Sequence, residues 1–133
     1  MITDSSITTW VETYVRAWRA EDAVERADAL ATLFTEDAES HEWPYETHWV
    51  GRHEIEKGWT RRLPWQEGGW TFDWQVLAVN GDTFVVRGLG RYTELGTFDN
   101  LWVVTIDEAS GRCSTFRMWN NEVTEGTELA TRS

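Results

Sequence analysis

The sequence of 133 residues predicts an α+β fold, with helices first and a curved antiparallel sheet after them. Apolar residues recur with a helical period through most of the first 63 residues, and from residue 70 they alternate as in half-buried strands. Gly-containing turns at 80–82, 95–97 and 107–111 divide the second part into strands. The chain also contains 10 tryptophans, so some of these rings must face a cavity, an interface or solvent.

Three helices are expected. The first presents an apolar stripe formed by Ile7, Trp10, Val11, Tyr14, Val15 and Trp18. The second runs from about Val24 to Phe34 and is rich in alanine. A short third helix covers 53–63 and ends before Pro64, because the residue before a proline disfavours the helical conformation.

The strands are expected at 38–42, 70–76, 84–92, 100–106 and 113–121. Val50, Gly51 and Arg52 are assigned to a turn before the third helix. Gly88 and Gly90 fall on one face of their strand, which indicates a bend or the close approach of another backbone. No repeat or linker is visible, so we expect one domain over 1–133, with a core at 7–122 and a flexible tail at 123–133.

The charge balance limits the partners. Asp and Glu number 23 against 12 Lys and Arg, and the net charge is -11. An acidic surface repels phosphate backbones and anionic lipids, so neither nucleic acid nor a membrane is expected as a partner. Cys113 is the single cysteine, which excludes an intramolecular disulfide and a cysteine zinc site. With no visible signal peptide and no apolar run of ~20 residues, these features favour a cytoplasmic protein.

Several short sequence segments, taken in order, resemble those of one protein family. They are Tyr14-Val15-Arg16-Ala17-Trp18, Leu33-Phe34-Thr35-Glu36-Asp37-Ala38, Trp49-Val50-Gly51-Arg52, Asn100-Leu101-Trp102-Val103-Val104 and Phe116-Arg117-Met118-Trp119. Over roughly residues 7–122 the chain resembles the NTF2-like superfamily, and within it the SnoaL-like branch. The resemblance implies a cone in which three N-terminal helices pack against the curved sheet, with a pocket at the open end, often in a homodimer. Members include ketosteroid isomerases, polyketide cyclases, dehydratases, epoxide hydrolases and non-catalytic binding proteins, so function stays open.

Glu42 is the first candidate for a catalytic group. Residues 38, 40 and 42 share one face of a strand, and Ala38 is expected to face inward. The resemblance implies the same role, because ketosteroid isomerases carry their carboxylate base in a similar stretch. In an apolar pocket the pKa of this carboxylate would rise toward the range of a useful base. The alternative is a solvated residue at the pocket rim.

Tyr14 and Asn100 are the candidate hydrogen-bond donors. Tyr14 lies on the inner helical stripe, and the resemblance implies that its hydroxyl binds an oxyanion; the alternative is a core tyrosine. The isomerases carry a second, acidic donor at a position that falls here near Trp102. Its absence argues against steroid isomerase activity, and Asn100 and the Trp102 indole would supply neutral donors instead.

The histidines are weaker candidates. His41 is expected to point away from Glu42, and His48 lies in a predicted loop from which it could reach the pocket mouth. Either could act as an acid or base. His53 opens the third helix, and the spacing of the three fits no zinc motif, so we predict no metal site and no cofactor.

The aromatic residues on predicted inner faces are expected to bind the ligand, although a plain core would use the same positions. With two further residues of the last strand, this set comprises Trp18, Trp59, Phe72, Trp74, Tyr92, Trp102, Phe116, Met118 and Asn120. Glu42 is the one charged group predicted inside. The sequence therefore predicts a pocket for a small hydrophobic ligand. Either an isomerase, cyclase or lyase acts there by proton transfer, or the domain is a non-catalytic binding or dimeric accessory protein.

Overall fold

The computed structural model describes residues 2–123. Except for Val123, which ends the last strand, the predicted flexible tail lies outside the described residues. The elements in chain order are α1 (Asp4–Arg19), α2 (Ala23–Leu33), β1 (Phe34–Trp43), β2 (Thr47–Val50), α3 (Arg52–Arg61), the 3-10 helix η1 (Leu63–Gln66), β3 (Trp70–Asn80), β4 (Thr83–Tyr92), β5 (Gly96–Asp107) and β6 (Arg112–Val123). No helix among the described residues is long and apolar enough to cross a membrane.

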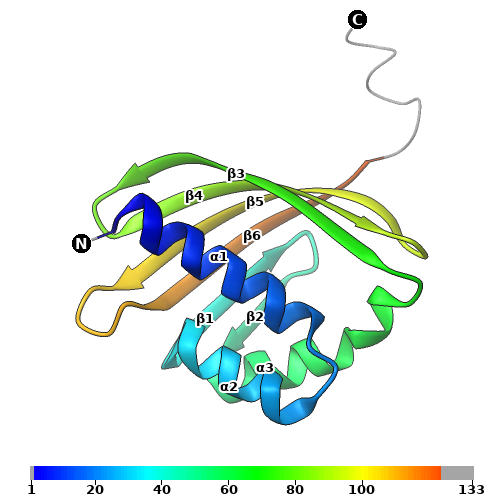
Figure 1. The fold of residues 1–133 in the computed structure, drawn as a ribbon, viewed down its shortest axis with the longest axis horizontal. Helices are drawn as coiled ribbons and strands as arrows, with labels where there is room; N and C mark the ends of the chain where they lie inside the picture. Colours follow the sequence, from blue (N-terminus) through cyan, green and yellow to red (C-terminus); the bar gives the residue numbers. More distant parts are fainter. Residues whose placement is uncertain (1, 124–133) are drawn as a thin grey trace, which may run out of the picture.

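The six strands form one curved sheet in the order β2-β1-β6-β5-β4-β3 (Figure 1). β1 and β6 are parallel and every other neighbouring pair is antiparallel, so the sheet is mixed. The prediction of a purely antiparallel sheet is therefore wrong. Local turn signals predict hairpins between consecutive strands, but they do not show that β6 returns to pair with β1, which lies about 80 residues earlier.

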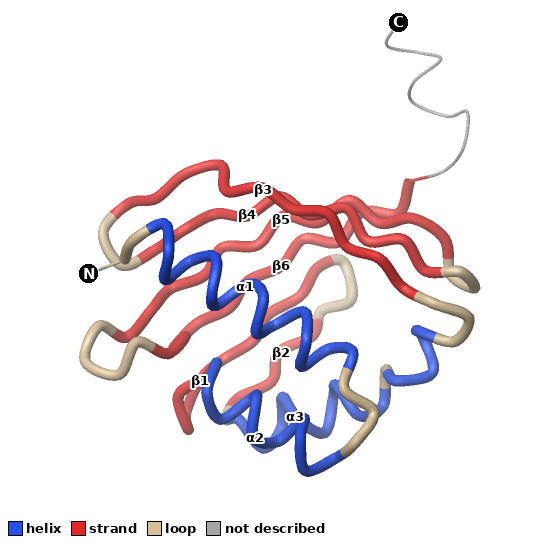
Figure 2. Tube along the Cα trace, in the orientation of Figure 1, coloured by secondary structure: helices blue, strands red, loops and turns tan. Residues whose placement is uncertain are grey.

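Only two of the three helices come before the strands. α3 follows the β1–β2 hairpin, which corrects the expected arrangement of three N-terminal helices. α1 lies across the concave side of the sheet, as both Figure 1 and Figure 2 show. Every residue of the predicted stripe is buried except Val15, which is half-buried, so the helical period identified the correct face.

Two local assignments differ from the predictions. Phe34 begins β1 rather than ending the second helix. Residues 47–50, expected as loop and turn, form the edge strand β2, in which Thr47 pairs with Glu42 and His48 pairs with His41. Four residues are too few to show a period, and pairing with β1 decides their conformation.

Candidate functional site

A cavity of about 590 Å³ lies between the C-terminal half of α1, the region around η1, and one end of the sheet. This end consists of the last residues of β1, β4 and β6 and the first residues of β3 and β5. The lining residues are Tyr14, Trp18, Glu42, Tyr45, Arg62, Trp65, Trp70, Phe72, Gly90, Tyr92, Leu95, Phe98, Asn100, Trp102, Met118, Asn120 and Glu122.

Glu42 lies in the wall of this cavity and is only 3% exposed. Strand alternation directs it inward with Ala38 and Ser40, which are also buried. Its Oε1 accepts a hydrogen bond from Nη1 of Arg62 at 2.5 Å, and the two form an ion pair. Burial raises the pKa of Glu42 above its ordinary value, and the positive charge of Arg62 opposes this rise without cancelling it.

Arg62 was missed by the sequence analysis. It follows α3, its side chain is 12% exposed, and its guanidinium lies 4.6 Å from the ring centre of Trp49 and 4.7 Å from that of Trp65. Such contacts hold a cation by its attraction to the π faces. An arginine at the end of a short helix is usually solvated, and nothing local links Arg62 to Glu42. Arg62 and Glu122 both line the cavity, so the prediction of Glu42 as its only charged residue is wrong.

Tyr14 reaches the cavity from α1 and is 6% exposed. Its ring centre lies 4.3 Å from that of Trp102 and 4.9 Å from that of Trp59. Burial, and after it the nearby charge of Glu42, raises the pKa of Tyr14 well above its ordinary value. The hydroxyl is therefore protonated at neutral pH and can donate a hydrogen bond.

Asn100 belongs to a polar row along the cavity wall. Its side-chain amide donates to Asn120, and its carbonyl accepts from the indole of Trp102 at 3.5 Å. Asn120 in turn donates to the hydroxyl of Tyr45 at 2.7 Å. These contacts orient Asn100 and use one of its two amide protons, which leaves the second for a ligand.

The buried indole N–H of Trp70 has no hydrogen-bond partner among residues 2–123, and that of Trp18 has none with hydrogen-bond geometry, although it lies near enough to the Tyr92 hydroxyl to oppose in part the rise that burial causes in the pKa of Tyr92. Both tryptophans line the cavity. A buried donor without a partner is costly, so a ligand that brought an acceptor to either indole would remove that cost.

The predicted ligand-binding set divides in two. Trp18, Phe72, Tyr92, Trp102, Met118 and Asn120 line the cavity. Trp59, Trp74 and Phe116 do not line it and instead pack in or against the core. Period identifies the inner face of a strand or helix but not the position along it, and the cavity occupies only one end of the sheet. Sequence reasoning left out Tyr45, Trp65, Trp70, Leu95 and Phe98, which lie in turns or at element ends.

The glycine at position 88 makes room for the aromatic wall. A Cβ at Gly88 would overlap the ring of Phe72 on β3, although the residue paired with Gly88 in the sheet is Trp74 and Phe72 is paired with Gly90. The ring of Phe72 in turn stacks on Trp102 with centres 5.2 Å apart. The close approach expected at this glycine is therefore made by a side chain and not by another backbone.

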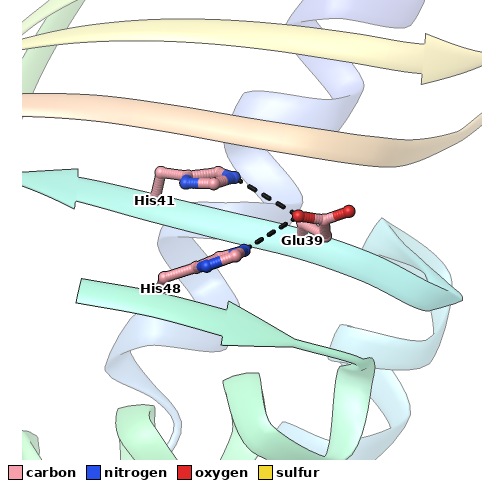
Figure 3. A group of neighbouring side chains, drawn as sticks. All are labelled: Glu39, His41 and His48. Carbon is pink, nitrogen blue, oxygen red and sulfur yellow. Dashed lines mark hydrogen bonds and ion pairs between the residues drawn. The ribbon is translucent and has the colours of Figure 1, made fainter.

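His41 and His48 lie on the other face of the sheet. They are paired across β1 and β2, and both contact the carboxylate of Glu39 (Figure 3). His48 belongs to a strand rather than to a loop at the pocket mouth. Because alternate residues point to opposite faces, neither imidazole reaches the cavity that contains Glu42.

Comparison with known families assigns the fold. Residues 11–123 match the model of the SnoaL-like domain, and the chain therefore belongs to this family. This match confirms the family resemblance inferred from the short sequence segments. Comparison with curated proteins gave no match.

Solved structures agree on the fold. A proposed isomerase of the SnoaL-like family from Agrobacterium tumefaciens has a TM-score of 0.72 at 16% identity, with 88% of this chain and 98% of the other covered. A proposed SnoaL-like polyketide cyclase from Shewanella putrefaciens also has a TM-score of 0.72, at 13% identity, with 98% and 88% covered. A protein from Catenulispora acidiphila with a ketosteroid isomerase-like fold, solved with trimethylamine, has a TM-score of 0.64 at 14% identity, with 90% and 88% covered.

Proposed function

We propose that this protein binds a small, mainly apolar carbonyl compound in the aromatic cavity and that Glu42 transfers a proton to and from that compound. The observation that carries the proposal is a buried carboxylate in the wall of a cavity lined mostly by aromatic rings. The reaction class is isomerisation, cyclisation or elimination next to a carbonyl group.

The size and lining of the cavity support a small-molecule ligand. Its volume of about 590 Å³ falls within the range of roughly 300–1,000 Å³ typical of small-molecule sites. The rings of Phe72, Trp102 and Trp70 form a stacked wall that offers flat apolar surface. The few polar groups beside this wall would orient a ligand with one polar end.

Glu42 has the properties of a base for a carbon acid. Arg62 holds its Oε1, which leaves Oε2 to accept a proton from the carbon next to the carbonyl group. The electron pair of the broken C–H bond forms the C=C bond of an enolate while the π pair of the carbonyl group moves onto its oxygen, and the protonated Glu42 then returns its proton to the same or another atom. A pKa raised by burial makes the carboxylate a stronger base than an exposed glutamate.

The developing oxyanion needs donors. The protonated hydroxyl of Tyr14 and the unpaired indole N–H of Trp70 belong to cavity residues and are available for this purpose. Neither is an acid comparable to the second donor of ketosteroid isomerases. We therefore propose a substrate whose C–H is more acidic than that of a simple ketone, such as a β-dicarbonyl or polyketide-like compound.

One observation favours a binding function without catalysis. The Glu42–Arg62 ion pair is held by Trp49 and Trp65, and a positive neighbour stabilises the carboxylate and so weakens it as a base. A domain of this kind would still bind ligands in the cavity. The expected homodimer, the cytoplasmic location and the single domain stay predictions.

The test separates binding from proton transfer. Ligand binding is followed by tryptophan fluorescence with cyclic ketones, β-dicarbonyl compounds and trimethylamine, the molecule present in the Catenulispora structure. Proton transfer is followed by NMR as exchange of α-protons of the bound compounds in D2O. Glu42→Gln is compared with Glu39→Gln, a matched change on the opposite face of the same strand.

We expect Glu42→Gln to slow the exchange by about 10²–10⁴-fold. Tyr14→Phe should slow it by about 10²-fold, and Glu39→Gln should leave it unchanged. Binding without exchange in the wild type would establish the non-catalytic alternative. If none of the compounds binds, the proposal of a ligand pocket fails as well.

A further inference from the structure

A second group of chemically active side chains lies on the outer face of the sheet, away from the cavity. Glu39 and His41 are two residues apart on β1, and His48 faces His41 across the β1–β2 pair. In Figure 3 all three side chains project from the same face and meet at one oxygen of Glu39. The Nε2 atoms of His48 and His41 lie 2.9 Å and 3.5 Å from Glu39 Oε1.

These three atoms have the chemistry and the spacing of a metal-binding set. One oxygen and two imidazole nitrogens lie within 4.8 Å of one another. In a tetrahedral zinc site, bonds of about 2.0–2.2 Å place neighbouring ligand atoms roughly 3.3–3.5 Å apart. Side-chain rotations that spread the two stacked imidazoles apart would therefore bring all three atoms onto one ion.

Contrary to the expectation from the sequence, we propose that Glu39, His41 and His48 bind a divalent transition-metal ion of the zinc type. Two imidazoles and one carboxylate favour Zn²⁺, Co²⁺, Ni²⁺ or Cu²⁺ over Mg²⁺ and Ca²⁺, which prefer oxygen ligands. The ligands are 24% (His41), 51% (His48) and 46% (Glu39) exposed, so water can complete the coordination. The site does not depend on the function proposed for the cavity.

The surroundings support a prepared site. The imidazoles stack with ring centres 4.2 Å apart, and the ring of Trp43 lies against the other side of His41 at 5.8 Å. Trp43 is itself stacked on Trp119 of β6 at 4.7 Å. Ligands on paired strands with ordered side chains lose little freedom when they bind an ion. Among residues 2–123 no other group of three such side chains converges, so one ion per chain is expected.

A bound ion would join an edge strand to the sheet. β2 is one of the two edge strands and contains only four residues, and its one strand neighbour is β1. His48 would attach β2 to the two ligands of β1. An ion that binds only the folded chain raises its stability, so the melting temperature should rise with the metal concentration.

The competing explanation is that the histidines only form hydrogen bonds with Glu39. Isothermal titration calorimetry of the untagged protein with ZnCl2 at neutral pH distinguishes the two. The variants are His41→Ala, His48→Ala and Glu39→Gln. His53→Ala, an exposed histidine at the start of α3, is the matched control. MgCl2 tests for nonspecific attraction to this acidic chain, whose net charge is -11.

We expect one equivalent of Zn²⁺ to bind, and each ligand substitution to weaken binding at least about tenfold. His53→Ala should bind as the wild type does, and Mg²⁺ should not compete. NMR of the imidazole nitrogens in the wild type should show Zn²⁺ on Nε2 of two histidines, which decides the question even if a variant fails to fold. The proposal is overturned if Zn²⁺ does not bind, or if it binds equally well to the variants that lack a ligand.

Discussion

Glu39 and Glu42 are three residues apart on β1 and lie on opposite faces of the sheet. Glu39 is exposed and shares its carboxylate with His41 and His48, whereas Glu42 is buried and pairs with Arg62. The hydrogen bond from His48 is the main cause that lowers the pKa of Glu39, and burial is the main cause that raises the pKa of Glu42. The two carboxylates have the same chemistry, and their pKa values are shifted in opposite directions.

The difference shows that desolvation changes the pKa of a buried carboxylate more than a charged partner does. Arg62 is permanently charged and so is the stronger partner, yet the pKa of Glu42 still rises. Water around Glu39 removes the desolvation cost, so weaker partners are enough to lower its pKa. One strand thus carries a candidate base on its inner face and a candidate metal ligand on its outer face.

The largest effect is expected when each carboxylate is removed. Glu42→Ala leaves the guanidinium of Arg62 buried without its partner, which should lower the free energy of unfolding by about 3 kcal/mol. Glu39→Ala should change it little, because the group is exposed. Urea denaturation measures both.

A double variant sharpens this result. Glu42→Leu combined with Arg62→Met should recover most of the loss, because neither member of the ion pair then leaves an unpaired charge in the cavity wall. Equal losses for Glu39→Ala and Glu42→Ala would contradict the contrast between the two faces.

The packing of the inner face is tested at Gly88. A methyl group there would displace the ring of Phe72, so Gly88→Ala should cost about 1–3 kcal/mol and weaken ligand binding to the cavity. Gly90→Ala is the matched control for stability, because the nearest atom to its Cβ would be the indole nitrogen of Trp70 at 3.3 Å, whereas a Cβ at Gly88 would overlap the ring of Phe72. Thermal unfolding and tryptophan fluorescence report the two effects. A loss no greater for Gly88→Ala than for Gly90→Ala would contradict the packing described here.

The two carboxylates should also give opposite pH dependences of stability. The pKa of Glu42 is raised in the folded state, so its contribution is fully present below the ordinary value of 4.5 and is lost as pH rises through the folded pKa. The pKa of Glu39 is lowered, so its contribution is present above 4.5 and is lost as pH falls through its folded pKa.

Melting temperatures measured at pH values below and above 4.5 give the pH dependence of both contributions to stability. The melting temperature of the wild type minus that of Glu42→Gln should fall as pH rises. The melting temperature of the wild type minus that of Glu39→Gln should rise. Slopes of the same sign would refute the assignment of the two environments.

The smallest effect is expected at His48. In metal-free buffer His48→Ala should change the free energy of unfolding by no more than about 0.5 kcal/mol, because the side chain is 51% exposed. The adjacent Trp49→Ala should cost more, because that ring contacts Arg62 and lies over Gly58 on the inner side. Thermal unfolding of both variants compares the two faces of the edge strand.

Local pattern was sufficient for much of this protein. The stripe of α1 and the alternation of Ala38, Ser40 and Glu42 follow from the fixed periods of helix and strand, so the inner faces could be predicted from residue order alone. The same alternation predicted that His41 points away from Glu42. The short sequence segments that resemble SnoaL-like proteins then indicated the family, which the match over residues 11–123 confirms.

The partners of these side chains depend on the tertiary structure. The parallel pairing of β1 with β6, the ion pair between Glu42 and Arg62, and the meeting of Glu39, His41 and His48 all depend on contacts between separate segments. The hydrophobic period predicts the face on which a side chain lies. It predicts neither whether the residue lies at the cavity end of the sheet nor which side chain it contacts. For that reason Trp59, Trp74 and Phe116 were correctly placed on inner faces and still lie outside the cavity.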